Sequence, residues 1–369
     1  MIVGNSTRDG LKVEMFSTLT IRGCALSASR APITVSLKAT SSFPACAYDY
    51  IEDPHPVPDS WAARGVSTPQ GTLEVSLLER ISEGRMGVTY STHVISATDD
   101  DGSDITKTLP ESVCLKFAKP QYCHSLAREA WFYEQLDECQ GISVARCHGF
   151  FSSAFSEQTT TPNSLLPWCD LEYPSEPDDE DGANLPWTPV VSADWLPDDR
   201  PCDEYWDTRN FKRDSPWNRW NFSTQESPTI SVLVLELLGE PCSKHWRSQW
   251  ARDKPPEGLK CVFSLCTSSR ITNSPFREDI TTIMDDITIY GVVHNDVTAF
   301  NFLRFTDNEV DAPQARCPRH NIVHGWRIID FDRSLRVDME NGTAEAKEDP
   351  ALYNSASIGA PGSFWGKCF

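Results

Sequence analysis

Hydrophobic and polar residues alternate along several short segments of this chain, and a period of two is typical of half-buried strands. Two of these segments lie near the N-terminus, and three follow one another with polar turns between them, which predicts a three-stranded meander. Two later segments are more uniformly apolar. The seven predicted strands are residues 16–27, 33–39, 73–78, 88–95, 113–117, 144–151 and 230–238.

A period near 3.6 replaces the alternation at residues 125–136, which predicts a helix. Leu126, Ala130 and Tyr133 fall at i, i+4 and i+7 on one face. Ser125 is the predicted N-cap, because a serine oxygen can accept a hydrogen bond from a free N–H of the first turn.

A second helix is predicted to start at Pro275, with Ser274 as its N-cap. Its apolar residues repeat at helical spacing and predict one buried stripe, formed by Phe276, Ile280, Ile283, Met284 and Ile287.

Length and composition indicate a folded protein. The chain has 369 residues, enough for one large two-lobed domain or two ordinary ones, and 39% of them are hydrophobic. The formal net charge is −20. Nucleic acid and anionic membrane surfaces both require a basic face, so neither is expected as a main partner.

The chain contains 13 cysteines, an odd number scattered over its whole length. We see no secretory leader before them and no apolar stretch near the roughly 18 residues of a membrane span. These features favour reduced thiols over a disulfide framework. We therefore expect a protein that is not secreted and resides in the cytoplasm, with the nucleus as an alternative.

Residues 152–229 separate the last two predicted strands and are rich in proline, tryptophan and acidic residues. Such a charge run, here residues 170–181, is typical of a solvated loop. Aromatic residues in a polar loop can also dock a protein partner. The tryptophans concerned are Trp187, Trp195, Trp206, Trp217 and Trp220.

Two polar motifs near the C-terminus offer candidate chemistry. His294-Asn295-Asp296 opens a loop that ends at Asn301, and Asp330-Phe331-Asp332 closes an apolar run. Asp296 could deprotonate a hydroxyl group, while Asn301 and Asp330 offer the oxygen ligands that Mg²⁺ prefers. For Asp332 we also consider a role as a turn residue, and for His294 we favour structural hydrogen bonding.

Upstream residues could complete such a site. Gly84 and Gly87 lie between two predicted strands, where glycines let the backbone approach phosphates, although an ordinary hairpin turn is the favoured explanation when this segment is taken alone. Lys116 interrupts an apolar strand, where a lysine is costly unless it is paired. Glu129 on the following helix could be its partner; the alternative is a lysine that extends to solvent from an edge strand.

In this order, the motifs resemble the protein-kinase-like superfamily, and within it the atypical, fungal-looking kinase-like proteins. Residues 81–90 resemble the glycine-rich loop, residues 113–116 the V-A-I-K strand, and residues 233–238 the hinge, with Leu235 at the gatekeeper position. The resemblance covers roughly residues 73–335.

The resemblance implies an α+β, bilobal fold. It would have a five-stranded antiparallel N-lobe sheet plus one helix (the family's helix C), and a mostly helical, truncated C-lobe. It divides the chain into an extension of unknown role at 1–70, an N-lobe at 71–238 that carries the insert 152–229, and a partial C-lobe at 239–369.

The same resemblance implies a phosphotransferase that uses ATP and Mg²⁺. Lys116, fixed by Glu129, would hold phosphates, Asn301 and Asp330 would hold Mg²⁺, and Asp296 would be the base. A protein serine or threonine is the expected acceptor, with sugars and small metabolites left open. Further nucleotide contacts are expected from Ser82, Gly84, Gly87, Cys114, Leu235, Glu236 and Leu238.

Several residues depart from the family pattern. Thr298 stands where protein kinases that act on serine or threonine carry lysine, and Asp332 replaces the usual glycine. Only residues 333–369 follow, and Ala360-Pro361-Gly362 lacks the glutamate of A-P-E. The alternatives are therefore a pseudokinase or scaffold that binds a nucleotide or partner without turnover, and a truncated gene product.

Cys317, His320 and His324 form a separate C-x₂-H-x₃-H pattern. A structural zinc site needs four ligands, and Cys261 or Cys266 could supply the fourth. A plain loop without metal is the favoured interpretation of this pattern.

Overall fold

The computed structural model describes ten segments of the chain. Several predicted features lie outside them, namely the acidic run at 170–181, the five insert tryptophans, Ser274, Cys261, Cys266 and residues 360–362. The described residues are 16–27, 29–44, 59–64, 71–84, 86–154, 166–169, 229–244, 275–306, 315–342 and 344–359.

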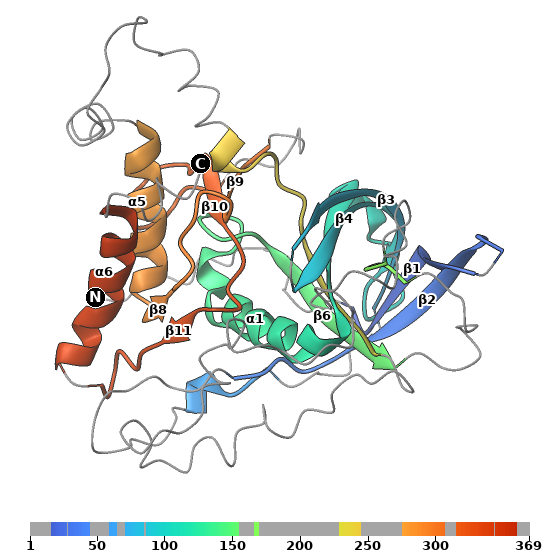
Figure 1. Cartoon of the computed structure of the whole chain (residues 1–369), viewed down its shortest axis with the longest axis horizontal. Coiled ribbons are helices and arrows are strands. Elements are labelled where there is room, and N and C mark those ends of the chain that lie inside the picture. Colours follow the sequence, from blue (N-terminus) through green and yellow to red (C-terminus); the bar gives the residue numbers. More distant parts are fainter. Residues whose placement is uncertain are drawn as a thin grey trace, which may run out of the picture.

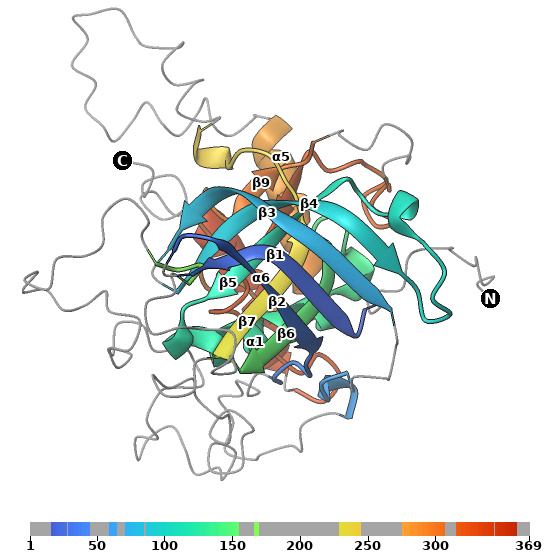
Figure 2. The same cartoon turned by 90° about the vertical axis from the view of Figure 1, so that its right-hand side faces the viewer.

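Seven strands form a closed β-barrel in the order β1-β2-β6-β7-β5-β4-β3 (Figures 1 and 2). The meander predicted for β3, β4 and β5 is present, with antiparallel pairing throughout. The strands are β1 Thr18–Leu26, β2 Pro32–Ala39, β3 Thr72–Glu83, β4 Gly87–Thr98, β5 Ser112–Ala118, β6 Cys147–Ala154 and β7 Thr229–Glu236.

The barrel closes through the two N-terminal strands. β1 pairs in parallel with β3, from Thr18 opposite Thr72 to Arg22 opposite Ser76. β2 pairs with β6 over a short antiparallel stretch. The other neighbours are also antiparallel, so β1 and β3 form the one parallel pair of the barrel.

Alternation along β5, β6 and β7 separates two hydrophobic cores. The first fills the barrel, where Val113, Leu115 and Phe117 of β5 pack with residues such as Leu19 and Ile21 of β1. Cys114 on the opposite face of β5 contacts the second core, which lies outside the barrel. The side-chain directions that alternation predicts for β5 are therefore confirmed.

The second core joins the barrel to the C-terminal part, and Figure 1 shows α1 between the barrel and the neighbouring helices α5 and α6. Two small antiparallel sheets, β8–β11 and β9–β10, lie in this part. The bounds are α1 Cys123–Gln135, α5 Pro275–Thr288, α6 Ala344–Gly359, β8 Val292–Val293, β9 Phe302–Arg304, β10 Trp326–Ile328 and β11 Leu335–Arg336. Short 3₁₀ helices are η1 Asp59–Trp61, η2 Thr106–Thr108, η3 Pro120–Tyr122 and η4 Asp137–Cys139.

The seven predicted strands and both predicted helices are confirmed, with shifted ends. Helix α1 begins before Ser125, and its N-cap is Tyr122, so the predicted cap is wrong. The reason is η3, whose turn from Lys119 to Tyr122 already directs the chain into the helix. In α5, the predicted stripe is buried at Ile280, Ile283, Met284 and Ile287.

The predicted bilobal α+β fold is wrong. Its five-stranded open sheet is instead a seven-stranded closed barrel, because β1 and β2 add two strands and join the sheet's two edges. The expected mostly helical C-lobe is also not found, since the described residues after β7 combine α5 and α6 with four short strands and loops. None of the helices that the structure describes is both long and apolar enough to cross a membrane.

We predict that β1 is an integral part of the folded core. Leu19 on β1 has 0% of its surface exposed, whereas Leu78 on β3 has 62% exposed. Leu19→Ala should lower the free energy of unfolding by roughly 2–5 kcal/mol because it leaves a cavity. The matched variant Leu78→Ala should change it by less than about 0.5 kcal/mol. Equal denaturant midpoints for the two variants would contradict this prediction.

Candidate functional site

Lys116 is the centre of a half-buried polar cluster outside the barrel. Its Nζ lies 2.6 Å from Oε2 of Glu129 on α1 and 2.6 Å from Oδ1 of Asp330 in the loop after β10. These partners are 13 and 214 positions away in the sequence. The structure thus forms the ion pair predicted between Lys116 and Glu129 and adds Asp330 to it.

Burial and charge compete within this cluster. Burial alone lowers the pKa of Lys116, but the carboxylates of Asp330 and Glu129 outweigh it and hold this pKa above its ordinary value. Burial raises the pKa of Glu129 to about 7, although Lys116 opposes the rise. At Asp330 burial raises the pKa, but the charge and the hydrogen bond of Lys116 together with His294 and Arg333 outweigh burial, so this pKa is lowered. The lysine therefore stays protonated and Asp330 stays ionised.

Asp332 is a second acidic group at this site. Burial raises the pKa of Asp332 well above its ordinary range, and the charge of Asp330 adds to the rise. Asp330 and Asp332 thus differ strongly in proton affinity although only one residue separates them, a pattern that is common among catalytic carboxylate pairs. From the sequence, Asp332 was considered a turn residue and was not among the predicted site residues.

Arg128 holds the loop that carries these carboxylates. Its side chain is fully buried, and its guanidinium donates hydrogen bonds to the carbonyl oxygens of Asp332 and Ser334, the latter at 2.6 Å. The guanidinium also lies over the ring of Phe132, 5.2 Å from its centroid. Arg128 was not predicted, because a polar residue within an amphipathic helix is usually read as solvent-facing.

Two backbone positions near the site have positive φ, at 69° for Asp330 and 58° for Asn295. Aspartate and asparagine tolerate this region better than most residues, but such conformations are still uncommon and concentrate at functional sites. Phe331 anchors the first of these turns, since its ring packs edge-on against Tyr133 and His294, with centroids 5.3 and 5.0 Å away.

The loop from His294 to Asn301 lies against the Asp330 segment. His294 is buried, and because a carbonyl only accepts, its Nε2–H donates to the Ile329 oxygen at 2.9 Å. Burial lowers the pKa of His294 and so favours the neutral ring. Asn301 donates through Nδ2 to the backbone oxygen of Asp296 at 2.9 Å and to its Oδ2 at 3.3 Å. The Asn301 carbonyl accepts from Ile329 N–H at 3.0 Å, which joins the two loops.

The glycine-containing segment is the tight turn between β3 and β4. Gly84 N–H donates to the Gly87 oxygen at 2.9 Å, and Ser82 pairs with Thr89 in the hairpin. A Cβ at Gly87 would lie 2.2 Å from the Phe117 oxygen, so only glycine fits there. This close packing explains Gly87 without a ligand, and a phosphate contact from this turn stays a prediction.

The residues predicted to surround adenine lie on neighbouring strands. Cys114 of β5 is opposite Leu235 of β7, and Cys114, Leu235 and Leu238 all contact the second core. Glu236 N–H donates to the Arg146 oxygen at 2.8 Å, and its side chain pairs with Arg327. This N–H is therefore engaged within the protein, and an adenine contact from Glu236 stays a prediction.

A small, partly open hollow lies beside Lys116. Its lining includes Met86 and Gly87 from the β3–β4 turn, and Glu129 and Asp332 from the charged cluster. In this conformation the hollow has room for about one water molecule.

We predict that Arg128 is essential for the stability of the Asp332 loop. Arg128→Met keeps the length of the side chain but removes the guanidinium, and each buried carbonyl left unsatisfied should cost roughly 1–3 kcal/mol. Arg22→Met is the control, since Arg22 is largely exposed in a surface ion pair of small energetic value. Denaturant unfolding of both variants measures the difference. An Arg128→Met variant as stable as Arg22→Met would contradict the prediction.

A scan of the chain against protein-family models and a search of curated proteins found no match. The predicted membership of the protein-kinase-like superfamily is wrong, because no family model supports it and the closed barrel differs from the bilobal fold of that superfamily. The motifs that suggested it are short, and such segments specify local chemistry rather than the path of the chain.

Proposed function

We propose that this protein is a phosphotransferase that uses Mg²⁺ and ATP and transfers the γ-phosphate to a hydroxyl acceptor. One observation carries the proposal: Lys116 Nζ lies 2.6 Å from both Glu129 and Asp330, beside a hollow and close to a glycine turn. A protonated amine held in place by carboxylates, next to a further acidic group, matches what phosphoryl transfer requires of a protein.

Lys116 is the phosphate-binding residue in this proposal. Its charge is maintained by Asp330 and Glu129, which raise its pKa in spite of burial. Glu129 comes from the buried helix α1 and keeps the ammonium group beside the hollow. An ammonium with several donors can then contact phosphate oxygens while Glu129 retains its position.

The donor set fits Mg²⁺. Asp330 offers carboxylate oxygens, and Asn301 offers its amide oxygen because its Nδ2 is held by Asp296. In phosphotransferases, Mg²⁺ is usually bound by one or two such protein side chains, and phosphate oxygens complete its coordination shell. When bound, the cation would neutralise charge on the phosphate oxygens.

Asp296 is the base in this proposal. Its carboxylate is held by Asn301, and its side chain is partly exposed, so an acceptor hydroxyl can reach it. A general base positioned in this way typically accelerates the chemical step by about 10²–10⁴-fold. A protein serine or threonine is the acceptor that we test first.

A second candidate is nucleotide binding without turnover. Thr298 favours it, because this threonine stands two residues after Asp296, where protein kinases that act on serine or threonine carry lysine. The two candidates share the binding step and differ in the transfer of phosphate, so they can be separated by experiment.

We predict that Mg²⁺ and ATP together raise the melting temperature of the full-length chain. At about 100 times the dissociation constant, binding adds roughly 2.7 kcal/mol of stability, equivalent to several degrees. Lys116→Met should abolish the shift, and Lys107→Met, at an exposed position, should retain it. A wild-type chain with no shift at millimolar nucleotide would contradict both candidate functions.

We further predict that Asp296→Asn lowers phosphate transfer at least about 100-fold and leaves the ATP-induced shift in place. The assay follows labelled γ-phosphate from ATP onto a library of serine- and threonine-containing peptides. Asp101→Asn, in the exposed β4–β5 connection, is the matched control. Equal transfer by both variants would rule out Asp296 as the base, and a shift without any transfer by the wild type would favour the second candidate.

A further inference from the structure

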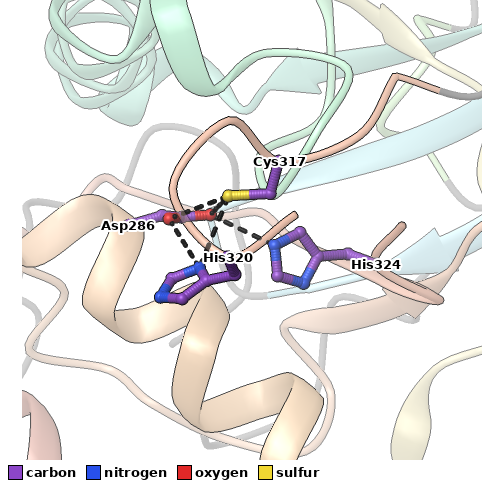
Figure 3. Close-up of side chains that lie close together, drawn as sticks. All are labelled: Asp286, Cys317, His320 and His324. Atoms are coloured by element: carbon purple, nitrogen blue, oxygen red, sulfur yellow. Dashed lines mark hydrogen bonds and ion pairs between the residues drawn. The ribbon is translucent and has the colours of Figure 1, made fainter. Parts of the chain in front are cut away.

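A second polar cluster lies away from Lys116, where the β9–β10 connection meets α5. Figure 3 shows Cys317, His320 and His324 of this connection directed towards Asp286 in the last turn of α5. One ligand atom from each of the four residues lies within 4.8 Å of the others. We propose that this cluster is a structural zinc site with Asp286 as its fourth ligand.

The distances match a tetrahedral metal site. Cys317 Sγ lies 3.4 Å from each carboxylate oxygen of Asp286 and 3.4 Å from His320 Nδ1. His320 Nδ1 and His324 Nε2 each lie 3.2 Å from Asp286. Zinc bonds of about 2.0–2.3 Å in a tetrahedron place neighbouring ligand atoms roughly 3.3–3.7 Å apart. These separations lie within a few tenths of an ångström of the tetrahedral values, and the remaining pairs of ligand atoms lie within 4.8 Å of each other.

A carboxylate outside the cluster orients one of the histidines. Asp279 Oδ1 lies 2.6 Å from His324 Nδ1, and Asp279 Oδ2 accepts from Gly325 N–H at 2.8 Å. Since the carboxylate accepts, Nδ1 carries the proton and the lone pair of Nε2 faces the cluster. Metal-binding histidines usually have such a carboxylate or carbonyl partner on the other ring nitrogen.

His324 Nε2 supplies an independent indication of a ligand. It is buried and, although 3.2 Å from Asp286 Oδ2, forms no hydrogen bond of acceptable geometry within the described residues. A buried acceptor without a hydrogen bond is costly, and a cation at the centre of the cluster would remove this cost.

Burial and charge also favour a divalent cation. Cys317 is 1% exposed, Asp286 4% and His324 2%, so water has little access to three of the four groups. A thiolate and a carboxylate together carry two negative charges, which Zn²⁺ balances. The mixture of sulfur, nitrogen and oxygen donors selects zinc over the oxygen-binding cations Mg²⁺ and Ca²⁺.

The surrounding loop is held in place for this role. Cys317 N–H donates to the Ile322 oxygen at 2.8 Å, and Asn321 N–H donates back to the Cys317 oxygen at 2.8 Å. Arg319 donates to the Asp285 oxygen on α5 at 2.6 Å. Because all four ligands come from the protein, the site is closed and its role is to attach this loop to α5.

Metal analysis of the purified full-length chain tests the proposal. We expect one zinc ion per chain by elemental mass spectrometry, loss of this zinc in Cys317→Ala, and retention in Cys24→Ala, whose thiol is equally buried inside the barrel. Asp279→Asn should keep the ligands but weaken zinc binding by about 10–100-fold.

Exchange of the metal for Co²⁺ adds a spectroscopic test that does not depend on zinc surviving purification. The wild-type chain should gain a thiolate-to-cobalt absorption band and the visible bands of a tetrahedral ion; Cys317→Ala should lack the thiolate band and Cys24→Ala should keep it. His320→Ala, at the partly exposed position of the cluster, is a second ligand variant if Cys317→Ala does not fold.

A wild-type chain that contains no zinc and gains no thiolate band with Co²⁺ would overturn the proposal. Zinc and an unchanged band in both ligand variants would overturn it as well, because the metal would then lie elsewhere. A zinc-free preparation that gains the band would support it.

Discussion

The arrangement of the described residues depends on keeping a charged lysine on the outer face of a barrel strand. The barrel interior takes Val113, Leu115 and Phe117, which leaves Lys116 between the barrel and the C-terminal part. An ammonium group there is stable only if it is compensated, and removing one partner of a buried ion pair is strongly destabilising. Glu129 and Asp330 provide the compensation, so one charge joins β5, α1 and the loop after β10.

Strands could be predicted from this sequence, but barrel closure could not. Alternation is a local property, and it identified the strands near residues 16–27 and 33–39 without reference to the rest of the chain. Closure requires β1 to pair in parallel with β3, and β2 to pair over a short stretch with β6. In both pairs the two strands lie far apart in the sequence. Alternation indicates which face of a strand is buried, but not which strand lies beside it. The family resemblance then led us to predict a sheet with too few strands.

The polar clusters show the same difference between local sequence patterns, which could be predicted, and contacts between distant residues, which could not. Lys116 stood out because it interrupts an apolar strand, whereas Arg128 lies in a helix where polar residues are ordinary and only its contacts with Asp332 and Ser334 show its role. The fourth residue of the metal cluster was sought among cysteines. Asp286 was missed because an aspartate 31 positions from Cys317 has no spacing signal in the sequence.

The β9–β10 hairpin connects the two clusters. Ile328 pairs with Phe302, and the Ile329 N–H donates to the Asn301 oxygen, so Asn301 and Asp330 lie at the same end of the hairpin. The opposite end of the hairpin is the pair of Trp326 with Arg304, and Cys317 and His324 belong to the connection that enters β10 there. A cation bound between this connection and α5 would restrain the hairpin at that end. It would thereby limit the freedom of the residues that we assign to Mg²⁺ at the other end, without contacting them.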